Sequence, residues 1–122
     1  MKTKIFKQIN FKHKVWLVTS EQKDLFGKGR WLLFKTIDEK GSLMAAIEEL
    51  GISYRKAWND IKHTENNLGL CLLDKSRGGS NHGSMTLTQD GQKLIRAYEH
   101  FNRKVERMIG AAYNEFYKEV NG

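Results

Sequence analysis

The sequence contains no proline and only one cysteine, and each shortage excludes something. Without proline, the chain has few residues that force a helix to break, which fits a helix-rich protein. Cys71 has no second cysteine with which to form an internal disulfide, so we expect a reduced thiol. Because it lies in the apolar run Leu70–Leu73, we predict that this thiol is buried and inert, in a reducing cytoplasm.

Long apolar runs are also missing. None approaches the roughly 20 residues that cross a bilayer, so a membrane is not an expected partner. The basic start, residues 1–14, has neither an unbroken apolar stretch nor a small-residue cleavage site, so we predict no secretory signal. The length of 122 residues suits one domain, and 39% hydrophobic with 29% charged residues is typical of a globular one.

Acidic residues are in the minority. The chain has 21 Lys and Arg residues against 14 Asp and Glu residues, a formal net charge of +7. Small basic proteins often bind polyanions, because Lys and Arg near phosphates release condensed counterions. The charge therefore favours a nucleic-acid partner, but it carries no information on sequence specificity.

Patterns that would indicate catalysis or metal binding are missing as well. The four histidines are scattered and have no Cys, Asp or Glu nearby at metal-ligand spacing. No Ser/His/Asp order, paired-carboxylate motif or reactive-cysteine context stands out. The glycines of residues 77–83 are not followed by the Lys-Ser/Thr of a P-loop. We therefore expect no enzyme, no catalytic residue, no metal and no cofactor.

Periodicity predicts the elements in the first third of the chain. Phe11–Val18 alternates as a strand does, and Leu25–Phe26 could return as its partner, giving an N-terminal β hairpin over 11–26. A helix of period 3.6 is expected from about Arg30 to Lys40.

Two short helices should follow, each with a serine cap. Gly41 and Gly51 are helix stops, and Ser42 and Ser53 are good N-caps. The first stripe is Leu43, Ala46, Ile47 and Leu50, and the second is Tyr54, Ala57, Trp58 and Ile61. This pattern predicts three helices over 30–68, with a helix-turn-helix at 42–68.

A hairpin and a long helix complete the prediction. Two short strands flank the segment KSRGGSNHGS, residues 75–84, which predicts a basic wing over 70–87. Thr88 should cap a helix over 89–119, whose apolar residues recur at 4-3-4-3-4 spacing. The predicted fold is mainly α with a small β component: a winged helix-turn-helix plus a long C-terminal dimerisation helix, a single domain over 1–122.

The polar side of the second short helix is the candidate site. With the apolar stripe inward, its N-terminal polar residues can enter the major groove, where Arg pairs with guanine and Asn with adenine. Wing residues suit the DNA backbone or the minor groove. The candidate DNA-binding residues are Ser42, Ser53, Tyr54, Arg55, Lys56, Asn59, Lys62, Lys75, Arg77, Asn81 and His82. The alternatives are an ordinary solvated helix face and an ordinary surface hairpin.

The C-terminal helix would be roughly 45 Å long, which exceeds the reach of so small a domain. We therefore expect its distal half to pair with a second copy, since it would otherwise expose a large apolar patch. The candidate dimerisation residues are Tyr98, Phe101, Val105, Met108, Ile109, Ala112, Tyr113 and Phe116. The alternative is that this stripe packs back onto its own domain.

Residues 27–61 and 76–95 closely resemble the N-terminal DNA-binding domain of the molybdate-responsive ModE regulators, itself similar to the winged helix of LysR-type regulators. The most specific pieces are GISYRKAW at 51–58, the glycine-containing wing at 77–83 and LTQDGQKLI at 87–95. The resemblance covers roughly residues 11–101. It implies a bacterial, nucleoid-associated transcriptional regulator that dimerises through the first strand region and the last helix and reads duplex DNA with the helix after Ser53.

ModE regulators also carry C-terminal modules that bind molybdate, whereas this sequence ends at Gly122, after the last helix. We therefore expect no molybdate-binding module and no cofactor, and either a stand-alone regulator or one whose effector is sensed by a separate chain. The main prediction is a dimeric transcriptional regulator. The alternatives are a nonspecific architectural DNA-binding protein and a protein-interaction adaptor on the same fold.

Overall fold

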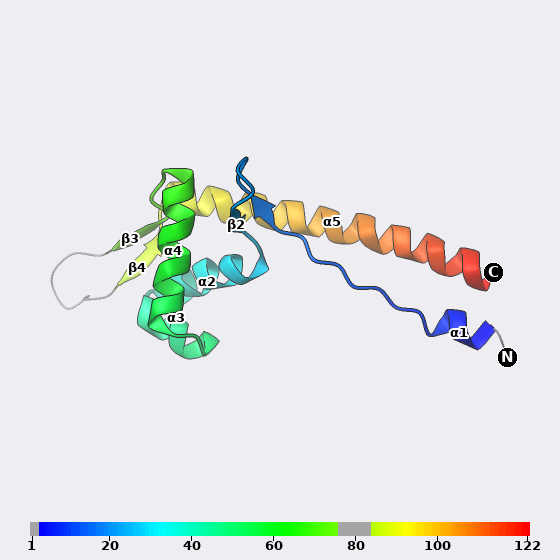
Figure 1. The fold of residues 1–122 in the computed structure, drawn as a ribbon. Helices are drawn as coiled ribbons and strands as arrows, with labels where there is room; N and C mark the ends of the chain where they lie inside the picture. The colour runs from blue at the N-terminus through cyan, green and yellow to red at the C-terminus, as the bar shows by residue number, and fades with distance from the viewer. Residues whose placement is uncertain (1–2, 76–83) are drawn as a thin grey trace. The chain divides into compact units, whose positions relative to one another are not determined.

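The structure, a computed structural model, describes residues 3–75 and 84–122. Within them the order of elements is α1 (Thr3–Lys7), β1 (Leu17–Val18), β2 (Asp24–Phe26), α2 (Lys28–Lys40), α3 (Leu43–Leu50), α4 (Tyr54–Leu68), β3 (Leu73–Lys75), β4 (Met85–Leu87) and α5 (Gln89–Asn121). The predicted mainly α, winged helix-turn-helix fold is confirmed (Figure 1). The chain divides into two compact units, one of residues 15–97 and one that joins residues up to 14 with residues 98–122.

The unit of residues 15–97 is built on α2, α3 and α4. Its core is formed by fully buried side chains from all three helices: Leu33, Phe34, Ile37, Ala46, Ala57 and Ile61. The apolar spacing predicted for each helix is what brings these residues to one side. The core therefore holds the three helices against one another.

The turns between these helices depend on glycine and serine, as predicted. Gly41 and Gly51 end α2 and α3 in the left-handed conformation, at φ 76° and 67°. Ser42 and Ser53 start the next helices, and each hydroxyl accepts a 3.0 Å hydrogen bond from a backbone N–H three residues on. These caps satisfy donors that the first helical turn leaves unpaired.

The wing strands β3 and β4 pair antiparallel, with Leu73 opposite Leu87 and Lys75 opposite Met85. The Met85 N–H donates to the carbonyl of Gly41 at 2.8 Å, so the hairpin is joined to the turn between α2 and α3. β3 begins at Leu73, three residues later than the strand predicted from Leu70. The tip that the sequence assigns to the wing, residues 76–83, lies outside the described residues.

The start of α5 packs closely on the residue before β3. Thr88 caps the helix as predicted, accepting from the Gly91 N–H at 3.0 Å. A Cβ placed on Gly91 would overlap the backbone oxygen of Leu72, far inside contact distance. This position therefore needs glycine for close approach and not for backbone conformation.

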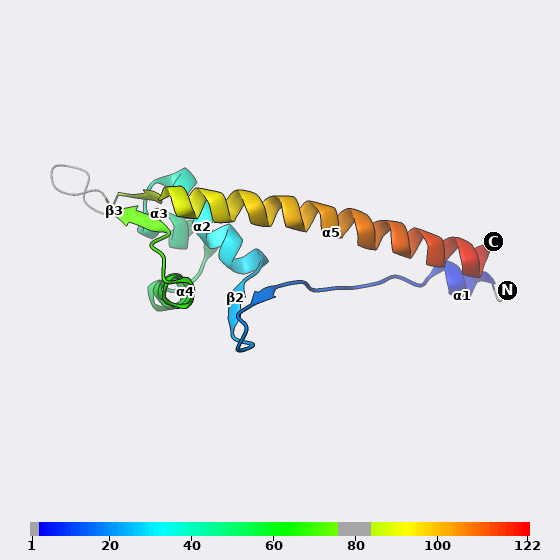
Figure 2. The ribbon, with the colours of Figure 1, turned by 90° about the horizontal axis from the view of Figure 1, so that it is seen from above.

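The second unit consists of the N-terminal segment, residues 98–121 of α5 and Gly122. Both views show the N-terminal segment running alongside this part of α5 (Figures 1 and 2). The Tyr113 hydroxyl donates to the Ile9 carbonyl at 2.6 Å, the rings of Phe11 and Tyr113 lie 4.6 Å apart, and His13 Nε2 lies 3.1 Å from Glu106 Oε1. α5 is one continuous helix of 33 residues and ends at Asn121, two residues past the predicted end.

The predicted bounds of the N-terminal hairpin are wrong. Only Leu17–Val18 of the predicted strand Phe11–Val18 is a strand, and it pairs with Asp24–Phe26, so the hairpin covers 17–26 instead of 11–26. Phe11 and His13 instead contact the side of α5, because alternation shows which side chains share a face and not which partner covers them.

Cys71 is exposed, not buried. Leu72 occupies the core in its place, at 1% exposure. Successive side chains of an extended chain point to opposite sides, so burying Leu72 turns Cys71 toward solvent.

Candidate nucleic-acid interface

One side of α4 carries an exposed row of polar side chains, which we call the α4 ridge: Arg55, Asn59, Lys62 and Asn66. Their spacing of four, three and four residues places them above one another on the helix. Among the described residues, Arg55 and Asn59 form no hydrogen bond or ion pair. The ridge is therefore a set of donors and cations turned to solvent, and Asn66 is a member that the sequence analysis missed.

The opposite side of α4 is buried, but not through all the residues predicted. Ala57, Ile61 and Thr64 are the buried ones. Tyr54, expected to face inward as part of the apolar stripe, is 52% exposed, and Trp58 is only half-buried. The buried side of α4 therefore extends one turn beyond the predicted apolar stripe, to Thr64. The polar Thr64 side chain can be buried there because its hydroxyl is hydrogen-bonded.

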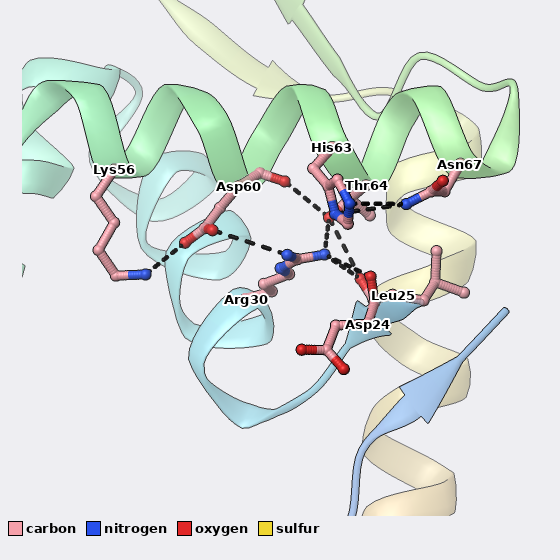
Figure 3. Close-up of polar contacts among 8 residues, drawn as sticks. All are labelled: Asp24, Leu25, Arg30, Lys56, Asp60, His63, Thr64 and Asn67. Atoms are coloured by element: carbon pink, nitrogen blue, oxygen red, sulfur yellow. Dashed lines mark hydrogen bonds and ion pairs between the residues drawn. The ribbon is translucent and has the colours of Figure 1, made fainter. Parts of the chain in front are cut away.

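Arg30 of α2 holds the back of α4 (Figure 3). Its Nη1 donates to the Leu25 carbonyl at 2.8 Å and to the Thr64 hydroxyl at 3.1 Å, and its Nη2 lies 3.8 Å from Asp60 Oδ1. One side chain therefore ties β2, α2 and α4 together. No local sequence pattern predicts this role of Arg30, because the bonded residues are up to 34 positions apart.

Lys56 lies beside the ridge and not on it. Its Nζ is 3.0 Å from Asp60 Oδ2, the same carboxylate that faces Arg30 (Figure 3). The predicted set of DNA-binding residues is therefore divided: Arg55, Asn59 and Lys62 share one face, while Lys56 is paired at its edge. The hydroxyls of Ser42 and Ser53 are occupied by the helix caps.

An aromatic row flanks the other edge of the ridge. The rings of Tyr54 and Trp58 stack with centroids 6.3 Å apart. The ammonium nitrogens of Lys62 and Lys75 lie 4.7 and 4.8 Å from the centroid of the Trp58 ring. The structure thus brings exposed Lys75 of β3 next to α4. The other predicted wing contacts, Arg77, Asn81 and His82, lie outside the described residues.

The predicted dimerisation residues of α5 differ in exposure. Met108, Phe116 and Phe101 are 63%, 44% and 40% exposed, Ala112 is exposed, and Val105, Ile109 and Tyr113 are half-buried. Tyr98 is only 4% exposed. Burial, and to a smaller degree the Glu106 carboxylate, raise the pKa of the Tyr98 phenol above its ordinary value of 10.0. Tyr98 therefore stays neutral and offers little surface to a partner.

Two further findings concern other kinds of site. The described residues contain no group of three or more His, Cys, Asp or Glu side chains that could hold a metal ion. Membrane crossing needs a helix that combines length with an apolar surface, and the described part of the chain has none.

Three core helices, a capped helix-turn-helix and a hairpin beside its second helix define a winged helix-turn-helix protein. Comparison with known families agrees: residues 30–92 match the model for "Bacterial regulatory helix-turn-helix protein, lysR family". The match covers more than half of the chain. The chain belongs to this family.

Two characterised relatives confirm the resemblance to ModE regulators. The chain is 33% identical over 95 residues to the molybdenum-pterin-binding protein MopB of Rhodobacter capsulatus, covering 78% of this chain and 34% of MopB. It is 32% identical over 87 residues to the DNA-binding transcriptional dual regulator ModE of Escherichia coli K12, covering 70% of this chain and 33% of ModE. The chain thus spans about a third of the length of these relatives.

Solved structures show the same fold. The DNA-binding domain in a CbnR–DNA complex superposes with a TM-score of 0.52 at 26% identity, covering 69% of this chain and 95% of that domain. CbnR itself, a LysR family transcriptional regulator, gives a TM-score of 0.55 at 21% identity, over 70% of this chain and 28% of CbnR.

Proposed function

We propose that this chain is a DNA-binding transcriptional regulator that reads duplex DNA with the α4 ridge. The observation that carries the proposal is the exposed row Arg55, Asn59 and Lys62 on a helix whose other side is packed into a core. A helix held rigidly from behind, with outward donors, suits the major groove of B-DNA. Membership of a regulator family and the match to a DNA-bound domain support the proposal.

Arg55 and Asn59 are the proposed base-reading residues. A guanidinium can donate two hydrogen bonds to guanine, and a side-chain amide can pair with both edge groups of adenine. The two residues lie one helical turn apart, and neither is engaged within the described residues. Lys62 and Lys75 carry positive charge beside them and are proposed to bind backbone phosphates.

The remaining predicted contacts are kept as part of the proposal. Ser42 and Ser53 cap helices whose first N–H groups can face a phosphate. Tyr54 and Lys56 flank the ridge. Arg77, Asn81 and His82 are proposed to contact the backbone or the minor groove on the evidence of the sequence alone.

We also propose that the protein acts as a homodimer through α5, so that residues 1–122 work as one winged helix-turn-helix domain with its dimerisation helix. The support is the exposure of Phe101, Met108 and Phe116 on one helix, since such side chains are usually covered. A two-fold dimer would present two copies of α4 to one duplex, one helical turn or a multiple of it apart.

The proposed regulator works on the bacterial nucleoid, in the cytoplasm, and is not an enzyme. Its DNA-binding part needs no cofactor. Because the matched residues correspond to about a third of MopB and ModE, we propose that effector sensing, including any response to molybdenum, belongs to structure outside the matched part or to a separate partner chain.

Selection of bound fragments from a random-sequence duplex pool, followed by affinity measurements on the selected duplex, tests the proposal. We expect Arg55→Ala and Asn59→Ala each to lose about 1–3 kcal/mol of discrimination between the selected duplex and variants of it. Arg96→Ala is the matched control, because Arg96 is an exposed helical arginine on another helix, α5. It should bind like the unaltered chain.

The alternatives give different results. A nonspecific architectural protein would bind the selected and the random duplexes equally well, and its affinity would show no preference as salt rises. An adaptor would bind neither duplex even at low salt, and that result would refute the proposed function.

A further inference from the structure

We propose that Trp58 is a positioning residue that holds Lys62 of α4 and Lys75 of β3 together as one binding site for DNA backbone phosphate. The inference rests on the proposed function and adds to it a residue that reads no base. It assigns a role to an aromatic side chain that the apolar spacing of the sequence placed in the core.

The primary observation is that one ring carries two cations. The Nζ atoms of Lys62 and Lys75 lie 4.7 and 4.8 Å from the same Trp58 centroid. Both distances are within the roughly 6 Å over which an ammonium group is attracted to an indole face. The two nitrogens can therefore be no farther apart than the sum of these distances.

The ring is placed by its neighbours on α4. Tyr54 is four residues before Trp58 and Lys62 four residues after it, so the three side chains follow one another along one side of the helix. The Tyr54 and Trp58 rings are nearly parallel, with an interplanar angle of 11°. Tyr54 thereby limits the orientations that the Trp58 ring can take.

Lys75 is brought to the ring by a separate anchor. Glu65 Oε2, on α4, accepts hydrogen bonds from the N–H groups of Leu72 at 2.7 Å and Leu73 at 3.3 Å. β3 therefore starts at a fixed point on α4, and Lys75 follows two residues later, in register with Met85 of β4. A charged hydrogen bond of this kind is stronger than a neutral one, so the base of the wing is held firmly.

The electrostatics of this arrangement favour an anion between the lysines. Two ammonium groups that lie over one ring repel each other, and the ring offsets only part of that repulsion. Glu65 Oε1 lies 3.5 Å from the Lys62 Nζ, while the other oxygen of Glu65 is used by the N–H groups of Leu72 and Leu73. Both lysines are exposed. A phosphodiester is the anion that a duplex supplies beside a helix in its major groove.

The salt dependence of binding to a random-sequence duplex is the appropriate measurement, since phosphate contacts do not depend on sequence. Log affinity falls as log salt rises, and each lost phosphate contact lowers the steepness of that fall by about 0.9. Lys62→Gln and Lys75→Gln should each lower it by about 1. Trp58→Leu, which removes no charge, should lower it by up to about 1, whereas Trp58→Phe should keep most of it. Lys93→Gln, an exposed lysine on α5, is the charge-matched control and should leave it unchanged.

A double-mutant cycle distinguishes positioning from mere proximity. If Trp58 holds Lys75 in place, Lys75→Gln should have a much smaller effect in the Trp58→Leu protein than in the unaltered one. An unchanged slope for Trp58→Leu, or a full Lys75→Gln effect in that background, overturns the inference and leaves the proposed function standing. Failure of the unaltered chain to bind any duplex removes both.

Circular dichroism and thermal unfolding of each variant verify that it folds. Should Trp58→Leu fail to fold, Trp58→Met replaces it as the ringless variant. With Trp58 intact, Lys62→Gln and Lys75→Gln should also be non-additive, because both lysines serve one phosphate site. Strictly additive effects of these two substitutions would count against the inference.

Discussion

The two units of this protein differ in how far their apolar side chains are buried. In residues 15–97, Phe34 is 1% exposed and Ile37 is fully buried, whereas Met108 and Phe116 in the other unit are 63% and 44% exposed. Of the buried hydrophobic residues in the described part of the chain, all but Tyr98 belong to residues 15–97. One unit is therefore stabilised by its own core, and the other relies on a few contacts along a helix and on a proposed partner.

The contacts that do hold the second unit are directional. A hydrogen bond, an aromatic pair and a histidine–glutamate contact connect the N-terminal segment to α5 through Tyr113 and Glu106. The hydrogen bond and the histidine–glutamate contact contribute less than burial of a large side chain, because water competes for both. The comparison therefore implies unequal stability along the chain.

The largest expected effect comes from removing a core aromatic. Phe34→Ala should destabilise the protein by about 3–5 kcal/mol, since it removes a large buried side chain and leaves a cavity. Phe116→Ala should change the unfolding of the isolated chain by less than about 0.5 kcal/mol and instead weaken the proposed dimer. Chemical denaturation and sedimentation equilibrium measure the two effects. Equal destabilisation by both substitutions would contradict the contrast between the units.

Two glycines in α5 give a sharper version of the same contrast. A Cβ on Gly91 would meet the Leu72 backbone oxygen, whereas a Cβ on Gly110 meets nothing within 4 Å. Gly91→Ala should therefore cost about 1–3 kcal/mol through forced displacement of backbone. Gly110→Ala should stabilise the helix by up to about 1 kcal/mol, because alanine is the better helix former. Thermal unfolding compares them, and a destabilising Gly110→Ala would indicate that a partner helix approaches there.

The most local effect concerns the N-terminal segment. Tyr113→Phe removes the hydroxyl that donates to the Ile9 carbonyl and should cost about 0.5–1.5 kcal/mol. Hydrogen exchange should become faster in residues 5–14 and remain unchanged in residues 15–97. Tyr117→Phe is the control, since the Tyr117 hydroxyl has no hydrogen bond among the described residues. Unchanged exchange in both variants would mean that the Tyr113 bond does not hold the segment.

The helix-turn-helix was predictable because its signals are local. Ser42, Ser53, Gly41 and Gly51 mark helix ends through interactions that span three or four residues. The outward face of α4 followed from the same periodicity, so the exposure of Arg55, Asn59 and Lys62 was predictable, while their contact with DNA stays a prediction.

Errors arose where the partner of a segment is distant in sequence. Alternation in Phe11–Val18 suggested a strand, but the face it created meets Tyr113 and Glu106 of α5. The role of Arg30 and the exposure of Tyr54 and Cys71 likewise depend on which neighbours arrive from elsewhere in the chain. Sequence spacing cannot report those neighbours.

From the residues alone one could place the capped helices, the basic side of α4 and the long amphipathic α5, because caps and helical periodicity act over one or two turns. Folding then settled matters that spacing leaves open. The folded structure places Lys75 beside the ring of Trp58, connects α4 to β2 through Arg30 and packs Gly91 against Leu72. Each of these joins residues from different elements, whose proximity follows from the packing of the core and not from the order of the chain.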